Sequence, residues 1–145
     1  FPEQHYLLQA HITPKIVDGL PAWFRVIYNF SEIQPSFWDT TTHIYTRLTR
    51  ERETRFGLAS LREVTERIAR ICSLDLFSSE IALAEDGQFL VVDYVNDPID
   101  LRLQSRAKDG VPDAIVEDIA AHIAEAAKTP APPADNFIRP ESNVP

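Results

Sequence analysis

Residues 76–96 read LFSSEIALAEDGQFLVVDYVN, and this stretch decides the fold. Two apolar runs, 76–84 and 88–95, flank the pair Asp86-Gly87. An Asp-Gly pair between such runs is the strongest short-range signal of a β-hairpin, because a type I′ turn needs two residues that tolerate positive φ. The stretch therefore predicts two antiparallel strands joined by a two-residue turn.

In that register, two carboxylates face each other across the hairpin, since Glu80 lies opposite Asp93. Facing like charges repel, so either one carboxylate holds a proton or a cation lies between them. Mg²⁺ prefers oxygen ligands, and Asn96 supplies a further carbonyl oxygen near the strand end. Glu80, Asp93 and Asn96 therefore form a candidate magnesium site, provided that a bulge at Tyr94 brings Asp93 and Asn96 to one face.

Two simpler interpretations of these carboxylates remain open. Acidic residues are common on solvated strand faces, and Asn96 can belong to an ordinary turn before Pro98. Alternatively, Glu80 pairs with Arg25, which could also stack on an indole ring. Removing the charge of Glu80 would relieve repulsion in a metal site, but it would destabilise a carboxylate that is paired with Arg25.

The remaining chain supplies further strands and two amphipathic helices. Strands are expected at residues 6–12 and 23–30, which should pair as a hairpin, and within 36–48; helices are expected at 58–72 and 112–128. This order predicts an α+β domain over residues 1–128, an antiparallel sheet with two main helices packed on one face. Residues 129–145 form a proline-rich tail, from which Phe137 and Ile138 are expected to dock on this chain or a neighbour.

Charge and composition narrow the function classes. The formal net charge of −8 disfavours nucleic-acid binding, which depends on Lys and Arg neutralising phosphates. No apolar run is long enough to predict a membrane span. Cys72 is the single cysteine, which fits a reducing, cytoplasmic setting. The chain has only four glycines and no glycine-rich phosphate loop, which argues against a P-loop or Rossmann nucleotide fold.

Several motifs, taken in order, resemble the C-terminal lobe of the ATP-grasp superfamily over residues 6–127. They are Gln9-Ala10-His11-Ile12, Arg25 within Trp-Phe-Arg-Val, Glu80 within Phe-Ser-Ser-Glu-Ile-Ala, and the run Phe-Leu-Val-Val-Asp-Tyr-Val-Asn-Asp-Pro that ends at Pro98. The likeness is greatest to the branch with ribosomal-protein glutamate ligases and inositol phosphate kinases. Two features depart from the family: its usual acidic-x-Asn spacing is here Asp93-x-x-Asn96, and its preceding lobe is missing from this chain.

The resemblance implies an ATP- and Mg²⁺-dependent carboxylate-amine ligase that acts through an acylphosphate on a small-molecule or peptide carboxylate. Gln9 and Ile12 would lie at the adenine, and Arg25 would bind the nucleotide and stabilise the transferred phosphate. Glu80, Asp93 and Asn96 would hold the metal. Without the preceding lobe, residues 1–145 alone are expected not to turn over ATP.

Two other functions are open from the sequence. One is an ATP-grasp kinase of a phosphorylated polyol, which the acidic charge disfavours. The other is a non-catalytic α+β module that binds a partner through Trp23, Phe37, Trp38 and the proline-rich tail.

Overall fold

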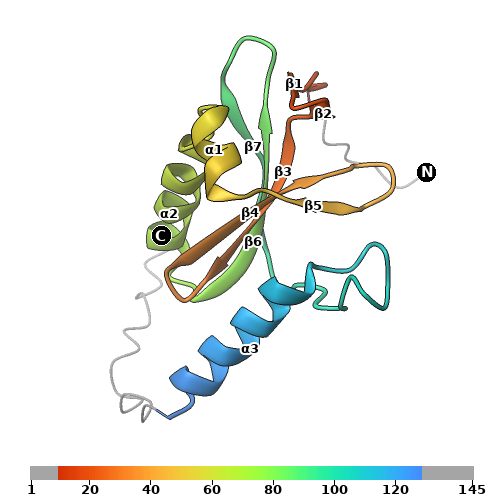
Figure 1. Cartoon of the computed structure of the whole chain (residues 1–145). Coiled ribbons are helices and arrows are strands. Elements are labelled where there is room, and N and C mark those ends of the chain that lie inside the picture. The colour runs from red at the N-terminus through yellow and green to blue at the C-terminus, as the bar shows by residue number, and fades with distance from the viewer. Residues whose placement is uncertain (1–9, 129–145) are drawn as a thin grey trace, which may run out of the picture.

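The computed structural model describes residues 10–128 as an α+β fold, which confirms the predicted class (Figure 1). Its strands and helices, in chain order, are β1 (Ile16–Val17), β2 (Leu20–Pro21), β3 (Trp23–Asn29), β4 (Glu32–Trp38), β5 (Tyr45–Arg47), α1 (Arg50–Arg55), α2 (Ser60–Cys72), β6 (Leu76–Leu83), β7 (Phe89–Asn96) and α3 (Asp113–Ala126). No helix within the described range is long and apolar enough to cross a membrane.

The main sheet has five strands in the order β5-β4-β3-β6-β7, and every neighbouring pair is antiparallel. β3 is central because its aromatic and β-branched residues alternate between two buried faces. A two-residue turn at Phe30-Ser31 joins β3 to β4, with φ of 47° and 78° at the two residues. This is the positive-φ pattern of a type I′ turn, built without the usual Asn or Gly.

One face of the sheet is closed by α2. Phe24 and Val26 of β3 pack there with Ile81 of β6 and Leu61 of α2, and all four side chains are fully buried. Burial of such side chains contributes roughly 1.5–3 kcal/mol each. Arg62 of α2 also reaches back and donates two hydrogen bonds, of 2.7 and 2.6 Å, to the buried carboxylate of Glu53 in α1.

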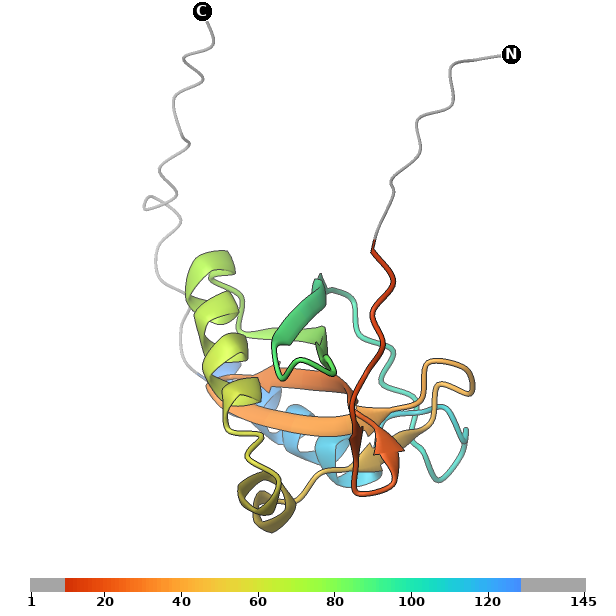
Figure 2. The same cartoon turned by 90° about the horizontal axis from the view of Figure 1, so that it is seen from above.

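The opposite face is covered only in part, by α3. Ile115 and Ile119 of α3 pack on Ile27 and Tyr45, together with Val111 from the preceding loop. The two main helices thus lie on opposite sides of the sheet (Figure 2). The prediction that both helices pack on one face was wrong, because the apolar residues of β3 alternate and leave both faces in need of cover.

Other predicted elements also change. Residues 10–12 are not in a strand, and residues 6–9 lie outside the described part of the chain, as does the proline-rich tail. The predicted hairpin of the first two strands is wrong, since β3 pairs with β4 and β6 instead. The region 36–48 holds the end of β4 and all of β5, separated by a loop, and α1 is a short helix that was not predicted from the sequence.

The β6–β7 hairpin forms as predicted, but its turn differs. Ala84 N donates to Gln88 O at 2.9 Å, so three residues rather than two make the loop, and Gly87 has a φ of 88°. A three-residue loop by itself would place Glu80 opposite Val92. Two irregularities in β7 then shift the register, and the first of them restores the pairing of Glu80 with Asp93.

Candidate functional site

Five residues, one from each strand of the main sheet, lie side by side across it. In spatial order they are Arg47 of β5, Ser36 of β4, Arg25 of β3, Glu80 of β6 and Asp93 of β7. Because facing residues of an antiparallel sheet project to the same side, these side chains share the α3 face. We call this set the polar row: arginines occupy one half of it and carboxylates the other.

The carboxylate half is built by the bulges of β7. The predicted pairing of Glu80 with Asp93 is confirmed. A second register shift pairs Asn96 with Ser78, two residues from Glu80 on the same strand and therefore on the same face. Ser79 stabilises this irregular stretch by donating a 2.5 Å hydrogen bond to Tyr94 O. The bulge that the Asp93-x-x-Asn96 spacing required is thus present.

Glu80 is held by donors from β3. Arg25 forms an ion pair with one carboxylate oxygen, and Trp23 Nε1 lies 3.4 Å from the other. The side chains of Arg25 and Glu80 are only 18% and 13% exposed. The pairing that the sequence left open is therefore real, whereas the side chain of Asp93 forms no hydrogen bond or ion pair with any other described residue.

The Arg25 guanidinium is also fixed by aromatic rings. Its central carbon lies 4.5 Å from the centre of the Trp38 ring, which in turn stacks on His43. The indole ring on which Arg25 stacks is thus that of Trp38 in β4. Burial raises the pKa of the nearby Tyr45 phenol above its ordinary value of 10.0, while the charge of Arg25 acts to lower it.

Several polar atoms around the row are buried without a partner among residues 10–128. They are Arg25 Nε, Ser36 Oγ, Ser78 Oγ and Asn96 Nδ2. Buried polar groups are nearly always satisfied in folded proteins, so each of these atoms is open to a hydrogen bond from a water molecule or a ligand. Arg25 Nε and Ser36 Oγ belong to facing residues, which puts two unused donors next to each other.

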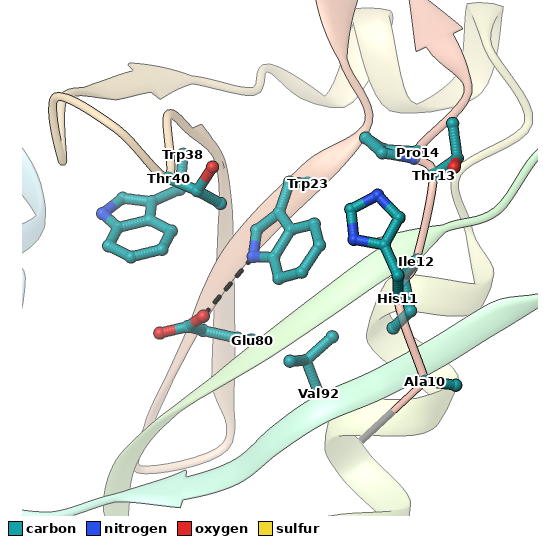
Figure 3. Close-up of a pocket in the computed structure, with 10 residues that line it drawn as sticks. All are labelled: Ala10, His11, Ile12, Thr13, Pro14, Trp23, Trp38, Thr40, Glu80 and Val92. Carbon is teal, nitrogen blue, oxygen red and sulfur yellow. Dashed lines mark hydrogen bonds between the residues drawn. The ribbon is translucent and has the colours of Figure 1, made fainter. Parts of the chain in front are cut away.

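A cavity of about 610 Å³ opens beside the row (Figure 3). Figure 3 shows Trp23, Trp38 and His11 around this space, with Glu80 joined to Trp23 by a hydrogen bond at its edge. Ile12, which was predicted to lie at the adenine, lines the same cavity together with Val92. Gln9, its predicted companion, lies outside the described residues.

The residues of the carboxylate half suit Mg²⁺ by their chemistry. Mg²⁺ is usually bound through one or two carboxylates, and water and substrate phosphates complete its octahedron. Glu80 and Asp93 would supply the carboxylates, and Asn96 the amide oxygen. Within residues 10–128 no group of three His, Cys, Asp or Glu side chains could hold a metal, so an all-protein cage is not formed there.

Three residues of this region had no role in the sequence-based prediction of the site. Ser36 could not be placed beside Arg25 because the start of β4, at Glu32, is hidden by the atypical turn Phe30-Ser31. Trp38 was predicted only as part of a partner-binding surface, and Tyr45 was not assigned to any site. The alternation of Ser36, Phe37 and Trp38 in β4 was the available signal that Ser36 and Trp38 share a second, partly polar face.

Comparison of the chain with protein-family models, curated proteins and solved structures finds no match.

Proposed function

We propose that residues 10–128 form the Mg²⁺- and phosphate-binding side of an ATP-binding site, in the C-terminal lobe of an ATP-grasp carboxylate-amine ligase. The polar row carries this proposal. It sets unused donors, Arg25 Nε and Ser36 Oγ, beside two facing carboxylates, one of which, Glu80, lines an open cavity. A metal-nucleotide complex needs both halves, because its phosphates accept hydrogen bonds while its cation requires oxygen ligands.

Each residue has a separate task in this proposal. Glu80, Asp93 and Asn96 would hold Mg²⁺, which neutralises the charge that develops on the phosphates. Arg25 and Ser36 would donate to phosphate oxygens, with Arg25 stabilising the transferred group. The cavity wall at Ile12 would receive the base.

The ligase remains favoured over a kinase of a phosphorylated polyol. The polar row has two arginines and two carboxylates, and Arg25 is already paired with Glu80. A highly phosphorylated substrate would need a surplus of cations around this site. The carboxylate substrate, the cytoplasmic location and the inactivity of residues 1–145 alone stay predictions.

One of the residues that were predicted to bind a partner, Phe37, is buried in the core. Phe37 is only 3% exposed and packs on Phe24 within the core of the α2 face, with ring centres 4.9 Å apart. Trp23 and Trp38 are engaged with Glu80 and Arg25. The aromatic residues therefore do not form a free apolar docking surface on the described part of the chain.

Tryptophan fluorescence tests the proposal directly, because both tryptophans of the chain, Trp23 and Trp38, line the cavity. Titration with Mg²⁺ and a non-hydrolysable ATP analogue should change the emission with a saturable curve. Asp93→Asn should weaken this binding by at least about tenfold, since even second-shell partners of a metal cost that much. Asp86→Asn removes an exposed carboxylate of the same hairpin and serves as the matched control.

Two sets of results would contradict the proposed nucleotide and metal binding. No saturable change at millimolar nucleotide, or the same affinity in wild type, Asp93→Asn and Asp86→Asn, would refute nucleotide binding at the polar row. Binding that depends on Asp93 but not on the presence of Mg²⁺ would refute the metal role of the carboxylates.

A further inference from the structure

We infer that Arg25 closes the metal site, so that a divalent cation and a phosphate group must bind together and neither binds well alone. This inference rests on the proposed function and adds a coupling between its two halves. It is carried by the contacts of Glu80, in which both carboxylate oxygens are already engaged by donors of β3.

Arg25 and a divalent cation compete for the carboxylate of Glu80. Asp93 is free of partners among the described residues, but a cation held between facing strands needs Glu80 as well. Arg25 occupies the Glu80 oxygen with a charged hydrogen bond in a half-buried setting, where it is less screened than on the surface. A cation therefore has to displace Arg25 before it gains its second carboxylate.

The charges of the row explain why displacement needs an anion. Arg25, Glu80 and Asp93 together carry a net charge of −1 when all are ionised. A bound dication turns this sum to +1 and sets a second positive charge beside the Arg25 guanidinium, which then loses its counter-ion. A phosphate oxygen at Arg25 restores the balance, and so phosphate and cation favour each other's binding.

The surroundings of Arg25 allow its guanidinium to leave Glu80 for a phosphate oxygen with only a small movement. The guanidinium rests on Trp38 at 4.5 Å, and this contact does not depend on Glu80. Arg25 Nε is buried without a partner, next to the equally unpartnered Ser36 Oγ. An oxyanion that reached these two donors would satisfy both of them, and charged hydrogen bonds from arginine are the contacts that phosphate oxygens accept.

Arg47 provides a matched control, because it belongs to the same row but lies beyond Ser36 and has no contact with Glu80. Arg47→Gln and Arg25→Gln remove the same charge from the same face. Only Arg25→Gln frees an oxygen of the Glu80 carboxylate.

The test measures binding of Mn²⁺ alone, which uses the same oxygen ligands as Mg²⁺, by the electron paramagnetic resonance signal of the free ion. Arg25→Gln should bind Mn²⁺ about tenfold more tightly than wild type, the factor that one charged hydrogen bond sets. Arg47→Gln should stay within about twofold of wild type, as expected for an exposed charge. With the non-hydrolysable ATP analogue present, Arg25→Gln should bind the metal-nucleotide complex more weakly than wild type.

Arg25→Lys is a second variant, in case Arg25→Gln fails to fold. It keeps the positive charge but lacks the forked donors of the guanidinium, so it should give an intermediate gain in Mn²⁺ affinity. Equal Mn²⁺ affinity in Arg25→Gln and Arg47→Gln, while Asp93→Asn still abolishes binding, would overturn the coupling and leave the proposed function standing. Mn²⁺ binding that Asp93→Asn does not weaken, in wild type and in Arg25→Gln alike, would overturn both.

Discussion

The two faces of the same sheet differ in how fully their buried polar groups are hydrogen-bonded. On the α2 face, Phe24 and its neighbours form a closed apolar core, and the buried carboxylate of Glu53 beside it accepts two hydrogen bonds from Arg62. On the α3 face, Arg25 and Glu80 are paired, yet donors beside them are buried without partners and an open cavity adjoins them. Complete satisfaction is typical of a face that serves stability, whereas the unpartnered donors of the α3 face support the proposed ligand site.

The largest difference should appear between adjacent residues of β3. Phe24→Ala should lower the free energy of unfolding by about 3–5 kcal/mol, because it leaves a cavity in the closed face. Trp23→Phe, one residue earlier and on the open face, should lower it by less than about 1.5 kcal/mol. Urea denaturation measures both, and equal losses would contradict the distinction between the faces.

The next effect concerns the ion pair of the closed face. Glu53→Gln should cost about 3 kcal/mol, since Glu53 is only 4% exposed and Arg62 would keep a charge without its acceptor. Glu51→Gln, on an exposed position of the same helix, should change the free energy of unfolding by less than about 0.5 kcal/mol. A loss of similar size in both variants would show that helix α1, and not the ion pair, responds to the change.

A smaller loss is expected in the polar row. Glu80→Gln should cost about 1.5 kcal/mol without metal, because Arg25 and Trp23 lose a charged acceptor. Asp93→Asn, which removes the facing charge but no described hydrogen bond, should stay within about 0.5 kcal/mol of wild type. A thermal melt in which Glu80→Gln is more stable than wild type would mean that repulsion from Asp93 outweighs the pair with Arg25.

The smallest expected effect is a pH dependence at α3, the helix that covers the open face, which α2 on the other face should not share. Hydrogen bonds from Ser105 hold the pKa of Asp113, at the start of α3, below its ordinary value of 3.8. A depressed pKa stabilises the fold above the ordinary value, and that contribution is lost as the pH falls through the lower, folded value. The Ser105 amide resonance should therefore shift at a pH below 3.8 and lose this shift in Asp113→Asn.

Its control lies on the other face. Amides of α2 should not follow the titration of Asp113, because that helix packs away from the loop that carries Ser105. A common midpoint for Ser105 and the α2 amides, unchanged in Asp113→Asn, would point to global acid unfolding instead.

The sequence predicted elements best where local chemistry sets them. Asp86-Gly87 located the β6–β7 hairpin, and the apolar spacing located α2. The β3–β4 hairpin was missed because Phe30 and Ser31 occupy a turn that usually takes Asn or Gly. Without that turn, neither Ser36 nor the partners of β3 could be assigned.

In the candidate site, too, some features could be predicted from the sequence and others could not. The facing of Glu80 and Asp93 was predicted from the hairpin, although the real loop is one residue longer and a bulge restores the register. Such an insertion has no local sequence signature when its residues are all apolar, as Val91 and Val92 are. The pair of Arg25 with Glu80 joins distant strands, so the sequence could offer it only as one of several options.

The most direct measurement of the central claim is the place where a divalent cation binds. In ¹⁵N-labelled protein, Mn²⁺ broadens the amide resonances near its site and leaves distant ones sharp. We predict that the earliest broadening, with the ATP analogue present, is centred on Glu80, Asp93 and Asn96 and disappears in Asp93→Asn. Broadening that is centred instead on the exposed turn at Glu85 and Asp86, and that persists in Asp93→Asn, would contradict a metal-nucleotide site on the polar row.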